Sequence, residues 1–433
     1  FGVGGGAGNR GWAAGLPGLV KTAAHEWAAA TCKAIDIERG AQSLEAIAER
    51  LADEILQGGG ELEVGLKADG RRVGLVLVSE PPEAVPYAPW VTNKSVVLAS
   101  GGARGVTAAA LEALAKAVQP RIVLLGRSPL VDEPEAVRGL KDGPEMKKAL
   151  LEAAKAEGLP LTPADLGRQV NQINAAREVR DTLRSLRRAG SEALYLEIDV
   201  RDETALKAGL GPIREAWGPI TGLVHGAGVL ADKLIADKTQ AQFDGVFDTK
   251  IAGLRALLGA VDPAKLKAVV LFSSVTARRG RVGQADYAMA NELLNKAARR
   301  LAAAHPACRV LAVDWGPWDG GMVTPALKKV FAAEGVGVVP LAGGAAWLAE
   351  ELGLARPGAT ELVVLGKPAG VAPPPPAPLP AVVAPAPKLR TAFKRELAVR
   401  THPFLASHVM GGKAVLPVAV IVEWMAHAAL QAN

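Results

Sequence analysis

Four side chains in the middle of this 433-residue chain have the types and spacing needed to donate a proton to a carbonyl group. Ser274 ends the apolar run AVVLFSS, Tyr287 follows thirteen residues later, and Asn291 lies one helical turn beyond the tyrosine. A phenol is a poor acid near neutral pH, so it needs a cation that lowers its pKa and a second donor that polarises the carbonyl. Lys250, in FDGVFDTKIAGLRALL, is the candidate cation. The pattern predicts Tyr287 as proton donor, with a packed tyrosine and a capping serine as the non-catalytic alternative.

A second group of residues predicts a nucleotide site. The segment GGARGVT lies directly between the apolar run SVVLAS and the helical pattern AAALEALAKAV. A glycine backbone can approach a pyrophosphate closely at such a turn, where the helix N-terminus offers free N–H groups and positive potential. The residues that we assign to this turn are Gly101, Gly102, Arg104, Gly105 and Val106.

The ends of the next strands predict which cofactor binds. Arg127, in LLGRS, stands where an acidic residue would hold the ribose 2′-hydroxyl of NAD, and a guanidinium instead suits a 2′-phosphate. NADPH is therefore the expected cofactor, with Arg104 as a second clamp, although two surface arginines would look the same. Further cofactor contacts are expected from Ser128, from Asp199 and Val200 near the adenine, and from Gly226, Ala227 and Gly228 of HGAG beneath the nicotinamide ribose.

Seven short apolar runs alternate with helical patterns and predict the elements that position these residues. The expected strands are 95–100, 121–126, 192–200, 220–228, 268–274, 309–316 and 361–366. This alternation is typical of an α/β fold with a doubly wound parallel sheet. An earlier run, 62–78, predicts a hairpin that turns at Asp69-Gly70.

Composition divides the chain into four parts. Residues 367–388 are rich in proline and alanine and predict an extended linker. We expect a structural subdomain without its beginning at 1–94, a catalytic domain at 95–366, and at 389–433 a piece too short to fold without help.

Bulk composition argues against several other functions. Cys32 and Cys308 have neither disulfide nor metal-site spacing, so a metal is not expected and a reducing cytoplasm fits best. We expect no targeting or membrane segment, because the longest apolar run is broken by Pro417 and Glu423. The net charge of +6 is spread along the chain, which favours an acidic carrier protein over nucleic acid.

The catalytic set resembles the short-chain dehydrogenase/reductase superfamily in its polyketide-synthase ketoreductase form, which takes its lysine from the helix before the serine strand. The segments SGGARGVTA and HGAGVLADKLIADKTQAQFDGVFDTKIAGL are similar to ketoreductases of bacterial polyunsaturated fatty-acid synthases, and related iterative synthases, including enediyne synthases, stay open. The resemblance implies a Rossmann-type sheet and reduction of a β-ketoacyl chain on the phosphopantetheine of acyl carrier protein. It also implies neighbouring ketosynthase, acyltransferase and dehydratase domains in a dimeric synthase.

Two departures from the family pattern bear on these expectations. Thr107 stands where the superfamily usually has a glycine, so the helix is expected slightly farther from the strand. In LAD, Asp232 keeps the last member of the fingerprint of ketoreductases that form the D-configured alcohol. Arg278, Arg279 and Arg281 are interpreted as solvated loop charges, with contact to the carrier as the alternative.

The C-terminal segment SHVMGGKAVLP resembles the start of a dehydratase hot-dog fold, an α+β domain. There, a strand and a glycine turn containing Gly412 present His408, and Pro417 begins the central helix. The acid partner comes from a second repeat in that family, so we expect no dehydration by this chain alone. A non-catalytic nucleotide fold that only docks neighbours is the competing interpretation of the whole chain.

Overall fold

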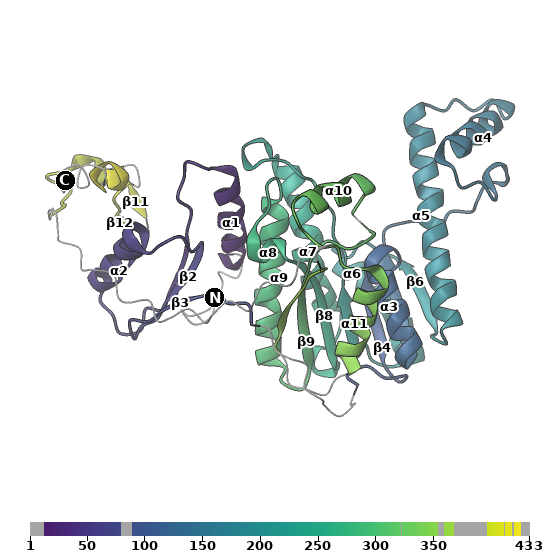
Figure 1. Cartoon of the computed structure of the whole chain (residues 1–433), viewed down its shortest axis with the longest axis horizontal. Coiled ribbons are helices and arrows are strands. Elements are labelled where there is room, and N and C mark those ends of the chain that lie inside the picture. The colour runs from purple at the N-terminus through teal and green to yellow at the C-terminus, as the bar shows by residue number, and fades with distance from the viewer. Residues whose placement is uncertain are drawn as a thin grey trace. The chain divides into compact units, whose positions relative to one another are not determined.

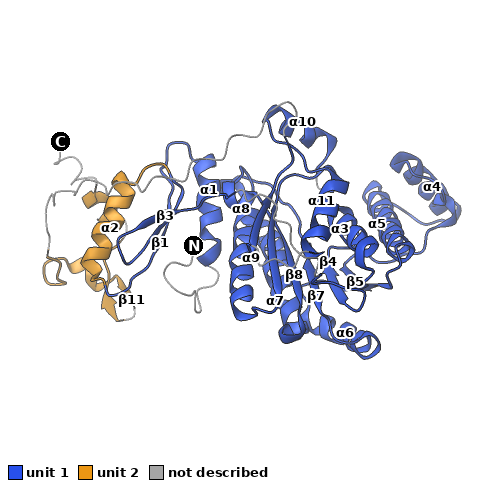
Figure 2. Cartoon of the chain, turned by 60° about the horizontal axis from the view of Figure 1, so that its bottom comes forward, with its two compact units in different colours: residues 1–41, 61–381 blue, residues 42–60, 382–433 orange. Residues whose placement is uncertain are grey.

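The computed structural model describes residues 13–78, 89–321, 323–353, 359–367, 396–410, 412–417 and 420–425. The chain forms two compact units, residues 1–41 with 61–381 and residues 42–60 with 382–433 (Figure 2). The predicted linker 367–388 lies outside the described residues, apart from Lys367.

A parallel sheet of seven strands forms the centre of the first unit within the described residues (Figure 1). Every pair of neighbouring strands in it is parallel. This confirms the predicted doubly wound α/β fold. The strands are, in spatial order, β10 (Glu361–Val364), β9 (Arg309–Trp315), β8 (Ala268–Ser274), β7 (Gly222–His225), β4 (Val96–Ser100), β5 (Arg121–Gly126) and β6 (Ala193–Glu197).

Strands β6 and β7 each end three residues before the end that the apolar pattern predicts, because their last predicted residues form turns. After β6, the Ile198 N–H still bonds to the carbonyl of Gly126, but Asp199 already accepts from the N–H of Asp202. After β7, the Gly226 N–H bonds to the carbonyl of Ser100 and the chain then leaves the sheet. These turns lie at the carboxyl edge, where ligands bind in open α/β sheets.

Helices cover both faces of the sheet. On one face, α3 (Gly105–Val118), α5 (Pro163–Arg188) and α11 (Leu341–Gly353) pack their leucines into one hydrophobic core. On the other face, α6 (Glu203–Trp217), α7 (Gln240–Ala260) and α9 (Ala285–Ala304) build a second core. Burial on both faces explains why β4, β8 and β9 read as continuous apolar runs.

The insertion between β5 and β6 forms a helical hairpin of α4 (Gly143–Ala156) and the first half of α5, which stands away from the sheet (Figures 1 and 2). Met146, Leu150 and Val170 belong to a small core of its own. Arg177 bonds to the carbonyls of Val137 and Leu140 at 2.8 and 2.6 Å and fixes the preceding loop.

The N-terminal segment contributes one helix and a small sheet to the same unit. Helix α1 (Leu16–Glu26) precedes β1 (Ala34–Ile37), which pairs in parallel with β2 (Glu63–Leu66). Strand β3 (Arg72–Gly74) pairs with β2 in the antiparallel sense, which confirms the predicted hairpin. Gly70 supplies the positive φ of 89° that its turn requires.

The second unit and the loops hold the remaining elements. Within the described residues, no helix is both long and apolar enough to cross a membrane, and no three His, Cys, Asp or Glu side chains gather as a metal site would require. The remaining elements, in the second unit and in the loops of the first, are α2 (Leu44–Gln57), η2 (Glu135–Val137), η3 (Ile235–Asp237), η4 (Pro263–Lys265), α8 (Thr276–Arg279), α10 (Pro325–Ala333), η5 (Pro403–Ala406), β11 (Val409–Met410) and β12 (Lys413–Ala414).

Candidate active site

The loops that follow β4 and β7 lie against each other at the carboxyl edge of the sheet. Gly101 has φ +67°, and a Cβ there would lie 2.7 Å from the backbone nitrogen of Ala227. A Cβ on Gly226 would likewise overlap the hydroxyl of Thr107, which packs onto this loop. The two predicted glycine loops are therefore brought together, and only glycine fits where they touch.

Lys250 and Tyr287 form the centre of the predicted catalytic set. Lys250 is buried on α7, and its Nζ lies 5.4 Å from the centre of the Tyr287 ring. The same ammonium group donates a 2.8 Å hydrogen bond to the carbonyl of Phe272 on β8. The lysine thus reaches the tyrosine from a neighbouring helix.

Ser274 and Asn291 complete this set. The Oγ of Ser274 is held 3.1 Å from the Oγ1 of Thr276. Asn291 is fully buried, and its Nδ2 donates to the carbonyl of Tyr287 at 2.8 Å. Its Oδ1 has no hydrogen-bond partner among the described residues, so this buried acceptor is available to a water or a ligand.

Burial sets the protonation of the pair. It raises the pKa of Tyr287, while hydrogen bonds from Asn291 and Ser274 lower that pKa in part. Burial also lowers the pKa of Lys250 to about 7, because the charged form loses its hydration. Without an anionic ligand, Lys250 is therefore close to its titration point at neutral pH.

His225, the first residue of the HGAG motif, lies in this site, although the sequence interpretation gave its side chain no role. It is fully buried, its Nδ1 lies 2.7 Å from the Oγ of Ser100, and its Nε2 lies 2.8 Å from the carbonyl of Lys250. A carbonyl only accepts, so Nε2 carries the proton and the serine hydroxyl donates to Nδ1. Burial and nearby Lys250 lower the pKa of His225 to about 3, so it stays neutral and supports the lysine backbone. A histidine directly before the HGAG glycines was the available signal.

The predicted 2′-phosphate residues lie around one cavity. Arg104, Arg127 and Ser128 line a space of about 690 Å³ together with α5. Tyr195 holds this wall in place, because its hydroxyl donates to the carbonyl of Ser128 at 2.8 Å. From α5, the cavity is also lined by polar side chains that the sequence interpretation did not include, namely Arg168, Asn171 and Gln172.

Two other predicted cofactor residues face different surroundings. Asp199 is bound by both Nε and Nη2 of Arg201, at 3.0 and 2.7 Å, and this pairing lowers its pKa. The side chain of Val200 is buried in the core beneath α7. Val200 therefore offers a cofactor only its backbone.

Asp232 lies next to the tyrosine helix. Its Oδ2 accepts a 3.0 Å hydrogen bond from Nε2 of Gln284, three residues before Tyr287. Behind it, Lys238 and Asp286 form a buried ion pair of 2.8 Å. The loop after β7 is thereby fixed to the start of α9.

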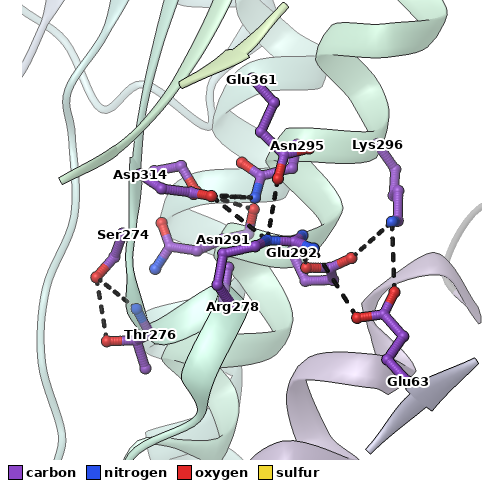
Figure 3. A network of polar contacts seen from close by, with 12 residues as sticks. Glu63, Ser274, Thr276, Arg278, Asn291, Glu292, Asn295, Lys296, Asp314 and Glu361 are labelled. Carbon is purple, nitrogen blue, oxygen red and sulfur yellow. Dashed lines mark hydrogen bonds and ion pairs between the residues drawn. The ribbon is translucent and has the colours of Figure 1, made fainter. Parts of the chain in front are cut away.

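Arg278 is not a solvated loop charge, and this part of the sequence interpretation was wrong. Its side chain is 7% exposed and pairs with Glu292, with Glu361 at 3.0 Å and with Asp314 at 3.4 Å (Figure 3). Burial alone would lower its pKa, but the three carboxylates raise it. Arg278 is therefore turned inward and away from solvent, whereas Arg281 stacks on the ring of Phe331 at 4.8 Å.

The C-terminal motif lies in the second unit. His408 is exposed and directly precedes the hairpin of β11 and β12, whose turn contains Gly412 at φ 77°. The carbonyl of Pro417 accepts from the N–H groups of Val420 and Ile421 at the start of helical residues 420–425. Hairpin, glycine turn and helix occur in the predicted order.

Family models match two parts of the chain. Residues 95–320 match the model described as KR domain, and residues 379–433 match the model of the polyketide synthase dehydratase domain.

A curated relative extends the match to most of the chain. It is a polyunsaturated fatty acid synthase polypeptide of Thraustochytrium sp. (strain ATCC 26185 / S-3), 34% identical over 386 residues, which cover 85% of this chain and 13% of that protein. Polyketide synthase PksL of Bacillus subtilis (strain 168) is 34% identical over 145 residues, 32% of this chain and 3% of that protein. The chain therefore spans a small part of these relatives.

Solved structures share the fold. A ketoreductase domain from the bacillaene assembly line superposes with a TM-score of 0.62 at 25% identity, covering 83% of this chain and 75% of that chain. The ketoreductase from the first module of phoslactomycin biosynthesis in Streptomyces sp. HK803 gives the same TM-score and identity, covering 82% and 70%.

Proposed function

Because this chain belongs to the KR domain family, the ketoreductases of multidomain synthases, we propose that it reduces a β-ketoacyl thioester on acyl carrier protein with NADPH. The observation that carries this proposal is the approach of the Lys250 ammonium to the Tyr287 ring at 5.4 Å. It joins a proton donor and a cation beside two glycine loops.

The residues of the chain divide the work of the reduction. The ketone oxygen lies between Ser274 and Tyr287; the serine hydroxyl donates to the developing oxyanion and Tyr287 delivers the proton. NADPH, when bound, supplies the hydride that the β-carbon receives. Lys250 would lower the pKa of the tyrosine and hold the ribose of the bound cofactor, and the free Oδ1 of Asn291 would order the proton relay. The product is a β-hydroxyacyl thioester.

The residues at the sheet edge fit NADPH. Arg127, Arg104 and Ser128 line one cavity, where two guanidinium groups suit a 2′-phosphate. Gly101, Gly102, Gly105 and Val106, at the N-terminus of α3, would hold the pyrophosphate, and Asp199 and the Val200 backbone would contact the adenosine. Gly226, Ala227 and Gly228 would contact the nicotinamide ribose.

Other expectations extend to the parent synthase. We propose that Asp232 favours the D-configured alcohol. We further propose that the parent synthase is dimeric and cytoplasmic, and that its ketosynthase, acyltransferase and dehydratase domains act on the same acyl carrier protein. We also propose that His408, Gly412 and Pro417 belong to the site of the dehydratase-like region, which the family model matches over residues 379–433.

The test is NADPH oxidation with an acetoacetyl or longer β-ketoacyl thioester. The wild-type chain should consume NADPH, and Tyr287→Phe should lose the rate at least a hundredfold, because only the proton donor is removed. Equal rates in the two proteins refute the assignment. A chain that binds no NADPH by calorimetry would support the scaffold alternative instead.

A further inference from the structure

Helix α1 lies directly beside the helix that carries Tyr287, although it is more than 250 residues away in sequence (Figures 1 and 2). A Cβ on Gly18 would lie 2.5 Å from the carbonyl oxygen of Ala288, the residue after the tyrosine. Glycine at this position therefore lets the two backbones touch next to the proton donor.

The same helix bonds to the backbone of residues 275–284, which include the short helix α8 and which we term the serine–tyrosine loop. The Nζ of Lys21 donates to the carbonyl of Ala277 at 3.0 Å, and the Nε2 of His25 lies 2.8 Å from the carbonyl of Arg279. These bonds run along the part of the loop between Ser274 and Tyr287.

Glu26, the last residue of α1, joins two loops through one carboxylate. Its Oε1 accepts from the N–H of Gly283 at 2.8 Å, and its Oε2 accepts from the N–H of Ile235 at 2.7 Å. Gly283 lies four residues before Tyr287, and Ile235 follows the loop that carries Asp232. A third bond, from the Lys233 N–H to the Gly283 carbonyl at 3.0 Å, closes the contact.

A buried ion network holds this arrangement from behind. Lys21 pairs with Glu63 of β2, and Lys296 of α9 lies 3.7 Å from Glu63 and 2.9 Å from Glu292 (Figure 3). Arg278, within the serine–tyrosine loop, pairs with the same Glu292. The N-terminal segment and the loop are therefore tied through buried charges, which are costly to separate.

We propose that Glu26 is a positioning residue of the active site, which fixes the serine–tyrosine loop to the Asp232 loop and thereby sets how the ketone faces the reductant. This inference rests on the proposed function. It assigns a role in the reaction to a segment outside residues 95–320, the part matched by the KR domain model.

The test compares Glu26→Gln with Glu215→Gln, which changes an exposed carboxylate on α6 of the same unit. The amide nitrogen of glutamine cannot accept a hydrogen bond, so one loop loses its acceptor. We expect kcat to fall about tenfold with the KM for NADPH changed less than about twofold, because the tyrosine is displaced but the cofactor site is intact. The product should change from one configuration to a mixture, and the amides of Gly283 and Ile235 should exchange with deuterium faster. Glu215→Gln should match the wild type in all four readouts.

Unchanged kcat, product configuration and amide exchange in Glu26→Gln would overturn the inference. A lower melting temperature without any kinetic or stereochemical change would also overturn it, because Glu26 would then be a stability contact only. A wild-type chain that reduces no β-ketoacyl thioester refutes the proposed function instead. The exchange rates of the two amides then still decide whether Glu26 orders these loops.

Discussion

The Nζ of Lys250 lies 5.4 Å from the centre of the Tyr287 ring and donates to the carbonyl of Phe272. The lysine comes from α7, the tyrosine from α9, and the carbonyl from β8, which lies between these two helices in the sequence. Sheet and helices therefore fix the distance between the lysine and the tyrosine ring, as the preorganised catalysis that we propose would require.

Titration of Lys250 should be visible in the rate of reduction. Its pKa is lowered to about 7 by burial, so the charged form prevails below that pH and is lost as the pH rises through it. In the proposed mechanism the charged form of Lys250 assists Tyr287, so kcat/KM should fall above pH 7, and that profile reports the pKa values of the free enzyme. The Lys250→Arg variant stays charged over this range, so its kcat/KM should not fall above pH 7, whatever its absolute rate.

Lys207→Arg, which exchanges an exposed side chain on α6, is the matched control, and its kcat/KM should fall above pH 7 as in the wild type. If kcat/KM falls above pH 7 in the same way in Lys250→Arg and in the wild type, a group other than Lys250 is responsible for the titration.

Arg127 should decide between the two nicotinamide cofactors. Arg127→Ala removes a guanidinium from the cavity that Arg104 and Ser128 also line, so NADPH should bind about ten- to a hundredfold more weakly. NADH has no 2′-phosphate, and its affinity should change little. Calorimetric titration with both cofactors measures the difference, and Arg255→Ala on the exposed side of α7 serves as control. Equal weakening for NADPH and NADH would contradict a 2′-phosphate contact.

Arg278 should contribute to stability rather than to carrier binding. Arg278→Met leaves the buried carboxylates of Glu292 and Asp314 without this partner, and breaking such a pair costs about 3–5 kcal/mol. The free energy of unfolding, from urea titration, should fall by an amount of that order. Arg300→Met, which changes an exposed side chain on α9, should alter the free energy of unfolding by no more than about 0.5 kcal/mol. A stable Arg278→Met with a raised KM for the carrier would restore the surface interpretation.

The sequence allowed the fold to be predicted because each signal for it is local. Continuous apolar runs mark β4, β8 and β9, and the Asp69-Gly70 turn marks the small hairpin. The long-range features were not predictable in the same way. Arg278 was misassigned because its partners come from α9, β9 and β10, three elements whose approach no short motif records.

The sequence predicted those residues of the candidate site that lie in recognisable motifs. Spacing identified Tyr287 and Lys250 as a pair, and the structure brings the two together. Glu26 carries no motif, because it acts through backbone N–H groups of other segments, which any sequence supplies. Its role depends on the packing of α1 against α9, which no short motif records.

Transfer of deuterium tests the central claim most directly. The chain is incubated with a β-ketoacyl thioester and NADPH that carries deuterium at the reactive carbon of the nicotinamide, and the product is analysed by mass spectrometry. Our account predicts a β-hydroxyacyl thioester one mass unit heavier, with the label on the β-carbon, and at least a hundredfold less of it from Tyr287→Phe. An unlabelled alcohol, a label elsewhere in the chain, or equal yields from the two proteins would contradict it.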